Sequence, residues 1–139
     1  MEAGRRAPQV PGRVRILDAG ALIALDRGDR DTWSLIADVA RQGLQPVVPA
    51  PVIAQAWRGG AGQARLAQAL SGTEKVVVGD TLSFRAGALL GAAGTSDVLD
   101  ALVALVAADR PGWEILTSDP DDIDHLLRAL GVRRVIRRV

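Results

Sequence analysis

The chain has 139 residues, 48% of them hydrophobic and 24% charged, and this size and composition fit one domain with a buried core. Its net charge of +1 indicates no class of partner, no apolar run reaches the length of a membrane span, and residues 1–12 lack the apolar stretch of a signal peptide, so we expect a soluble, cytoplasmic protein with no membrane partner. Because cysteine is absent, disulfides and thiolate metal sites are excluded, and any metal must be bound by oxygen or by the single histidine.

Strands and helices alternate along the chain. In chain order, we predict a strand at 14–17, helices at 19–25 and 32–41, a strand at 47–48, helices at 52–57 and 63–70, a strand at 76–78, helices at 82–90 and 97–108, a strand at 113–117, a helix at 121–130 and a strand at 132–139. Thr95 and Ser96 can cap the helix that follows them. The arginines of the last strand are typical of a sheet edge.

This alternation predicts a parallel or mostly parallel sheet with helices on both faces, which is the three-layer α/β/α sandwich. The run at 97–108 is apolar on most faces and is therefore expected to be a buried helix. We expect residues 1–13 to form a disordered arm and residues 14–139 to form a single domain.

Several aspartates fall where such a fold places functional sites. In open α/β sheets, sites form beyond the carboxyl ends of the strands, where Asp18 and Asp119 follow the first and fourth predicted strands. Asp97 and Asp100 are three residues apart, so they share one face near the start of the buried helix. Clustered buried carboxylates repel one another unless a cation neutralises them, and oxygen ligands suit hard divalent ions. The set therefore indicates a Mg²⁺ or Mn²⁺ site.

Each acid also has a structural interpretation. Asp18 could be a loop residue at a strand end, and Asp119 could cap the last helix, in whose first turn Asp122 is favoured by the helix dipole. Asp97 could likewise be a first-turn residue. Asp100 lies further into an apolar helix, so it is the strongest single candidate for a functional role.

Four blocks occur in a fixed order: LDAGALIAL at 17–25, VVPAPVIAQAWRGG at 47–60, TSDVLDALVALVAA at 95–108 and LTSDPDDIDHL at 116–126. Together they span residues 17–126, most of the chain, and resemble the PIN-domain family, in particular the VapC-type toxins of type II toxin–antitoxin systems. No block is distinctive alone, and their order and spacing carry the resemblance. It implies a PIN-like fold for residues 14–139.

In that family, acids from these blocks hold one or two divalent ions. Carried over block by block, the resemblance implies a metal site of five aspartates, with Asp18, Asp100 and Asp119 as the catalytic core and Asp97 and Asp122 as direct or water-mediated supporters. The implied activity is metal-dependent hydrolysis of RNA phosphodiester bonds by an endoribonuclease, with Mg²⁺ or Mn²⁺ activating water. The implied protein partners are a cognate antitoxin, whose C-terminal segment enters the active-site groove, and a second copy in a homodimer.

Two positions depart from the family pattern. Gln55 stands where the family usually has glutamate, and its amide lends a carbonyl oxygen but no charge. Gly20 stands where a small hydroxyl residue is common. We assign Gln55 and Thr117 supporting roles, with the Thr117 hydroxyl orienting the aspartates. Arg58 is a candidate contact to RNA phosphate, although a solvated arginine at a helix end is the alternative interpretation.

A second function remains open. Gln55 is compatible with a catalytically weak PIN-like module that binds RNA or a protein partner. The chain has no phosphate-binding loop, no dinucleotide fingerprint and no H-E-x-x-H motif, so nucleotide switches and zinc proteases are disfavoured. His125 is more typical of a surface residue than of a ligand, and the C-terminal arginines fit either RNA steering or protection of a sheet edge.

Overall fold

Five short strands form one sheet in the order β3-β2-β1-β4-β5, and every neighbouring pair is parallel. The computed structural model describes residues 14–139, so the arm predicted at 1–13 lies outside the described residues. The strands are β1 Val14–Leu17, β2 Val47–Pro49, β3 Glu74–Val76, β4 Glu114–Thr117 and β5 Ile136–Arg138. The parallel sheet is confirmed, and so is the position of the last strand at its edge.

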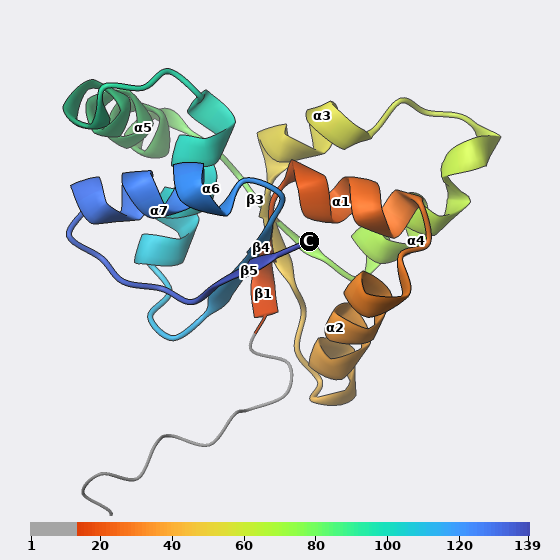
Figure 1. Cartoon of the computed structure of the whole chain (residues 1–139). Helices are drawn as coiled ribbons and strands as arrows, with labels where there is room; N and C mark the ends of the chain where they lie inside the picture. Colours follow the sequence, from red (N-terminus) through yellow and green to blue (C-terminus); the bar gives the residue numbers. More distant parts are fainter. Residues whose placement is uncertain (1–13) are drawn as a thin grey trace, which may run out of the picture.

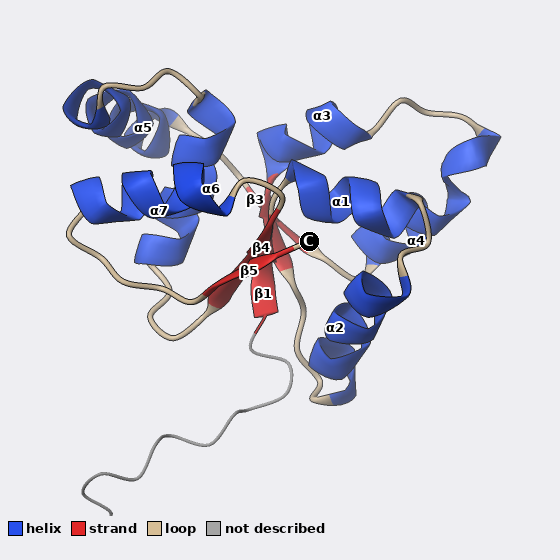
Figure 2. Cartoon of the chain, in the orientation of Figure 1, coloured by secondary structure: helices blue, strands red, loops and turns tan. Residues whose placement is uncertain are grey.

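Helices cover both faces of the sheet (Figures 1 and 2), which confirms the three-layer α/β/α sandwich. On one face, α1 packs against α2, α3 and α4, and on the other α5, α6 and α7 pack against one another. The α-helices are α1 Ala19–Asp26, α2 Arg30–Arg41, α3 Ile53–Ala56, α4 Ala64–Ser71, α5 Asp80–Ala93, α6 Val98–Ala108 and α7 Pro120–Ala129. Short 3₁₀ turns, Ala50–Val52 and Ala61–Gln63, precede α3 and α4.

Helix α6 lies in the core, as its composition predicts. All residues from Ala101 to Ala107 are buried, and the helix contacts β1, β2, α5 and α7. Burying each large aliphatic side chain is worth roughly 1.5–3 kcal/mol, so sliding or tilting this helix would expose much of the core. The first turn of α6 is therefore held firmly in place, together with the aspartates that it carries.

Several predicted boundaries are wrong by a few residues; the last strand, for example, is Ile136–Arg138 rather than 132–139. The third strand is Glu74–Val76 rather than 76–78, and Val77 is 83% exposed. It pairs with only one neighbour, β2, so its residues need not be apolar on both faces and its position is poorly marked in the sequence. The helix predicted at 82–90 extends to Ala93 in α5, and Gly94, whose φ is 70°, ends it in the left-handed conformation.

The predicted cap of the helix after α5 is also different in the structure. Asp97, rather than Thr95 or Ser96, caps α6, because its side chain accepts a hydrogen bond from the backbone N–H of Asp100.

Within residues 14–139, no single helix is long and apolar enough to cross a membrane; α5 and α6 reach that length and hydropathy only together, and they bend by 107° at their junction.

The order of the strands creates a crevice at one edge of the sheet. From β1 the chain adds β2 and β3 on one side, and then returns to add β4 and β5 on the other. In open parallel sheets, such a reversal separates the loops that follow the two central strands, and ligands bind in the space between them. Here those strands are β1 and β4, and the residues that follow them are Asp18 and the pair Ser118 and Asp119.

Candidate functional site

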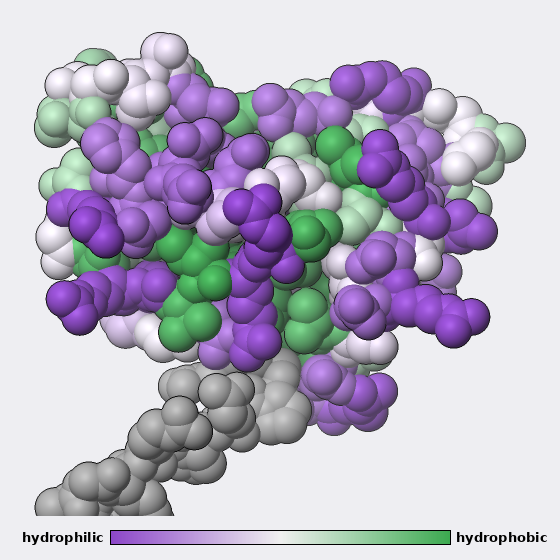
Figure 3. Space-filling view, in the orientation of Figure 1, coloured by the Kyte–Doolittle hydropathy of each residue, from purple (hydrophilic) through white to green (hydrophobic). Residues whose placement is uncertain are grey.

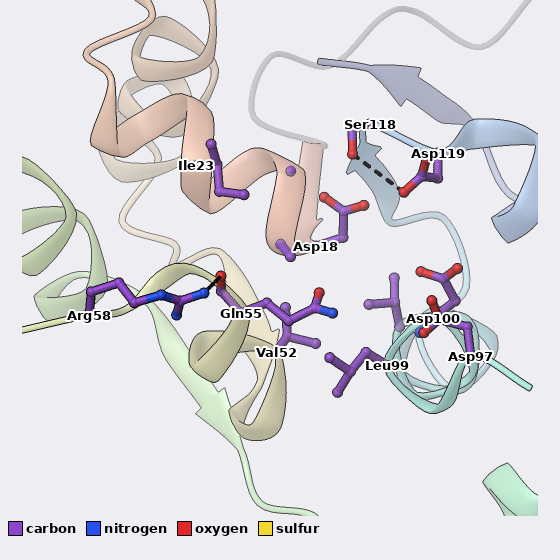
Figure 4. A pocket seen from close by; sticks show the side chains of 13 residues that line it. Asp18, Ile23, Val52, Gln55, Arg58, Asp97, Leu99, Asp100, Ser118 and Asp119 are labelled. Carbon is purple, nitrogen blue, oxygen red and sulfur yellow. Dashed lines mark hydrogen bonds between the residues drawn. The ribbon is translucent and has the colours of Figure 1, made fainter.

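A cavity of about 400 Å³ lies at this crevice (Figure 4). Its walls come from the starts of α1 and α6, from α3, and from the loop after β4. The polar residues that line it are Asp18, Gln55, Arg58, Asp97, Asp100, Ser118 and Asp119. The carboxylates of Asp18, Asp100 and Asp119 face the same space, so the structure brings together the three aspartates of the predicted catalytic core.

Asp18 forms the floor of the cavity and is only 4% exposed. Its Oδ1 accepts a hydrogen bond of 2.9 Å from the N–H of Ala21, so it also caps α1, and the Thr117 hydroxyl donates to its Oδ2. Burial raises the pKa of the Asp18 carboxyl, and hydrogen bonds from Thr117, Ala21 and Ser118 offset part of that effect. The structural and functional interpretations are compatible, because the two carboxylate oxygens offer about four lone pairs and these three hydrogen bonds leave one of them free.

Thr117 connects the ends of β1 and β4. It is fully buried, and its hydroxyl donates to Asp18 while accepting a hydrogen bond of 2.9 Å from the N–H of Asp119. One side chain therefore sets both the rotamer of the Asp18 carboxylate and the backbone orientation at Asp119. These contacts are those expected of a hydroxyl that orients the aspartates.

Asp119 stands at the N-terminal cap position of α7, yet its side chain makes no capping hydrogen bond. Its carboxylate is instead turned toward the cavity, with Oδ2 3.5 Å from the Ser118 hydroxyl (Figure 4). The alternative interpretation of Asp119 as a helix cap is therefore wrong for its side chain. The carboxylate is free to bind a ligand.

Asp100 has the most perturbed acidity in the cavity. Desolvation by burial raises the pKa of its carboxyl, and the negative charges of Asp97, Asp119, Asp122 and Asp18 raise it further, to about 7. The N-terminus of a helix favours a negative charge, yet the crowding of acids outweighs that preference here. A group balanced between two protonation states near neutral pH is typical of a functional site.

Gln55 and Arg58 form the wall opposite Asp100. The side-chain amide of Gln55 is turned toward the cavity (Figure 4). The Arg58 guanidinium donates to the carbonyl oxygens of Ala54 at 2.9 Å, Trp57 at 2.8 Å and Gln55 at 3.1 Å, and so caps the end of α3. Arg58 is thus neither freely solvated nor paired with an acid in the described part of the chain.

Asp122 and His125, which the sequence also singled out, do not line the cavity. Asp122 is exposed in the first turn of α7 and acts on the site through its charge, by raising the pKa of Asp100. His125 lies outside it, with Nε2 2.8 Å from the carbonyl oxygen of Ala93 at the end of α5. This contact joins α7 to the end of α5.

The acids surround the cavity without forming a closed ligand shell. Within residues 14–139, no three His, Cys, Asp or Glu side chains lie close enough together to hold a metal ion directly. The donor chemistry nevertheless fits Mg²⁺ or Mn²⁺, because all the donors are oxygens and the cavity is lined by four carboxylates and one arginine. Mg²⁺ commonly keeps several waters and is bound by one or two carboxylates together with substrate phosphates, an arrangement that an open site permits.

No protein-family model and no curated protein matches this chain. Function must therefore be inferred from the cavity itself, whose acidic lining and neighbouring arginine are suited to a cation and a phosphate group.

Ser118 and Gly20 are cavity residues that the sequence did not mark as parts of the site. A Cβ atom on Gly20 would lie 2.2 Å from the Ser118 Oγ, so the absence of a side chain in α1 makes room for the serine. The only available signal was the departure of Gly20 from the resembled family. Nothing in the sequence indicates that a serine 98 positions later fills the space, since that contact depends on the β1–β4 pairing.

Proposed function

We propose that this protein is a divalent-metal-dependent endoribonuclease of the PIN-domain type, which hydrolyses RNA phosphodiester bonds. The observation that carries the proposal is the convergence of Asp18, Asp100 and Asp119, from three separate elements, on one cavity at the reversal point of the sheet. By its sequence resemblance, we further propose that it acts in the cytoplasm as the toxin of a type II pair, with a cognate antitoxin and a second copy as partners.

In this proposal Asp18, Asp100 and Asp119 would hold the Mg²⁺ or Mn²⁺ ion, one or two of them directly and the rest through water, because no three acids of residues 14–139 lie close enough to bind it together. Asp97 and Asp122 would act through bound water. When bound, the cation lowers the pKa of a coordinated water and stabilises charge on the phosphate and on the leaving oxygen. Thr117 keeps the Asp18 carboxylate oriented for this role through its hydrogen bond. The Gln55 amide offers a neutral oxygen donor on the opposite wall.

Cation binding is coupled to a proton in this arrangement. The pKa of Asp100 is about 7 without a cation, so a large fraction of the protein holds a protonated Asp100 near neutral pH. Carboxylates must be deprotonated to bind a metal, so cation binding releases that proton and is weaker at lower pH. We therefore expect cleavage to rise with pH between about 6 and 8.

One observation favours the alternative of a binding module with weak catalysis. Gln55 is uncharged, and no three acids in the described chain form a tight metal-binding group. Such a site would bind a cation weakly and depend on the phosphates of the RNA to complete its coordination. The two functions differ in whether bound RNA is cut.

The decisive experiment is incubation of the purified full chain with a pool of structured and single-stranded RNAs in Mg²⁺, Mn²⁺ or EDTA. The proposal expects cuts that appear with Mg²⁺ or Mn²⁺ and disappear with EDTA. RNA that is bound but left intact under every metal condition would favour the binding module. Failure both to bind and to cut would remove both functions.

Replacing Gln55 with Glu should tighten cation binding. The new carboxylate adds a charged ligand to a cavity wall that now offers only an amide, and affinity for hard cations rises with ligand charge. We expect the Kd for Mn²⁺, measured by calorimetry at pH 8, to fall roughly 3- to 10-fold. The matched control is Gln68→Glu on the exposed side of α4, which adds the same charge away from the cavity. Equal Kd values for the two variants would show that Gln55 does not face the cation.

A further inference from the structure

A polyanion that enters this cavity meets a field of its own sign. Four carboxylates line the cavity, from Asp18, Asp97, Asp100 and Asp119, and Arg58 is the single cationic lining residue among the described residues. One divalent ion offsets at most half of the negative charge of these four carboxylates. The RNA phosphates that flank the cleaved bond add further negative charge. An RNA strand is therefore stabilised here only where fixed cations flank the acids.

Arg58 meets this requirement on the α3 side. Its hydrogen bonds go to carbonyl oxygens at the end of α3, and no carboxylate of residues 14–139 forms an ion pair with it. The same contacts hold the guanidinium at the cavity wall before any ligand arrives. A cation held in place in this way loses less conformational freedom on binding than a free arginine does.

Arg138 supplies a fixed cation on the β5 side of the acids, across the cavity from α3. It pairs with Thr117 in the parallel register of β4 and β5, which brings it to the edge where the acids lie. Its Nη1 donates to the carbonyl oxygen of Ser118 at 3.4 Å, next to Asp119. It is exposed, and no carboxylate within residues 14–139 forms an ion pair with it. Hydrophilic side chains gather over β5 in the middle of the face seen in Figure 3.

The other arginines of the C-terminal run have different partners. Arg137 pairs with the buried Glu114 at 2.7 Å. Arg134 donates to the carbonyl oxygens of Ala107 and Ala108 at 2.9 and 3.0 Å, and so caps α6. Arg133 precedes β5 and lines a separate cavity beside α7. Arg138 is therefore the arginine of this run that lies beside the acids.

From these placements we infer that Arg58 and Arg138 bind the backbone phosphates on either side of the cleaved bond, so that a single RNA strand crosses the carboxyl edge of the sheet from α3 to β5. This inference rests on the proposed function and adds the path of the substrate. Phosphate contacts fix the position of a strand without reading its bases, so this pair sets register rather than sequence.

The test measures binding separately from cleavage. A fluorescein-labelled single-stranded RNA that binds the wild-type protein is titrated with full-length Asp100→Asn protein, and binding is followed by anisotropy across a series of KCl concentrations. The same titration is made with Arg58→Gln and Arg138→Gln added singly to that background. The matched control is Arg41→Gln, which makes the same change in net charge. Arg41 ends α2, and the chain then leads into the start of β2, at the edge of the sheet opposite the cavity.

Each of the two substitutions should weaken RNA binding about tenfold at 0.1 M salt, because it removes a charged hydrogen bond to phosphate. Each should also reduce the slope of log K against log salt by about 0.7, the value for one contact with a single strand. Arg41→Gln should change neither quantity. Arg58→Gln removes the cap of α3, whereas Arg138 has one carbonyl contact, so the Arg138 variant tests the path even if α3 loosens.

The inference is overturned if Arg138→Gln has the affinity and salt slope of the Arg41 control, or if the Asp100→Asn protein binds no RNA. Wild-type cleavage, assayed in parallel, separates this result from the proposed function. Metal-dependent cutting with no effect of Arg138→Gln would remove the path and leave the nuclease. RNA binding that depends on both arginines, without any cutting, would keep the path and remove the nuclease.

Discussion

Replacing Asp100 with Asn should lower RNA cleavage by at least about 100-fold while the protein stays folded. Loss of a residue that only orients a metal ligand costs 10- to 100-fold, and Asp100 is proposed to be a ligand itself. The substitution keeps the size of the side chain and removes its charge, so α6 has no reason to shift. Initial rates of cutting in Mg²⁺ and the circular dichroism spectrum give the two measurements.

The same variant should be more stable than the wild type at pH 8 in EDTA, by a margin that narrows as the pH is lowered from about 7 toward 3.8. The folded protein raises the pKa of Asp100 from 3.8 to about 7, so between these values it holds a proton that the unfolded chain has lost. Stability from this group is complete below pH 3.8, falls as the pH rises, and is gone above about 7. Asn carries no charge at any pH, so the variant does not lose this stability as the pH rises.

The control for both effects is Asp31→Asn, an exposed first-turn aspartate of α2 that is remote from the cavity. It should cut RNA at the wild-type rate. The difference between its melting temperature and that of the wild type should not increase as the pH rises. Cleavage by Asp100→Asn within a few fold of the wild type would remove Asp100 from the catalytic core. A melting temperature that is equally offset at pH 5 and pH 8 would contradict the crowding of acids around it.

The fold could be predicted because its strongest signals are local. β1 and β4 are short apolar runs that end at polar residues, and α6 is too apolar to be anything but buried. The third strand was misplaced because it pairs on one side only, so Val77 and Val78 could be apolar without being in the sheet. A hydrophobic run indicates a strand reliably only where both faces of the sheet are covered.

The three core aspartates could be predicted from their positions at element ends, since parallel strands place their carboxyl ends at one edge. Contacts between segments that are far apart in the sequence could not be predicted. The role of Arg138 depends on the register of β5 with β4, and the shared hydrogen bonds of Thr117 depend on the pairing of β1 with β4. The capping by Arg58 depends on where α3 ends, within a turn of a few residues whose bounds the sequence marks weakly.

Gly20 and Ser118 should behave as a complementary pair. The resembled family usually places a hydroxyl residue at the position of Gly20, and here Ser118 fills that space from the neighbouring strand end. A Cβ on Gly20 would lie 2.2 Å from the Ser118 Oγ, 2.5 Å from its Cβ and 3.0 Å from its backbone N. The substitution Gly20→Ser therefore forces α1 away from the loop after β4, and with it the cap that Asp18 provides.

Overpacking of this kind costs roughly 1–3 kcal/mol, so we expect Gly20→Ser to lower the melting temperature by about 3–10 °C in thermal unfolding followed by circular dichroism. Adding Ser118→Gly should restore about half of the loss, because the side-chain overlaps disappear while the contact with the backbone N remains. The control is Gly87→Ser on α5, where a new Cβ meets nothing within 4 Å and serine is the better helix former. Equal melting temperatures for Gly20→Ser and the wild type, or no recovery in the double variant, would show that this wall of the cavity adapts rather than being fixed by the pair. If the loss and its recovery are both seen, cleavage by the double variant then reports whether a hydroxyl supplied from α1 can take the place of the one now supplied after β4.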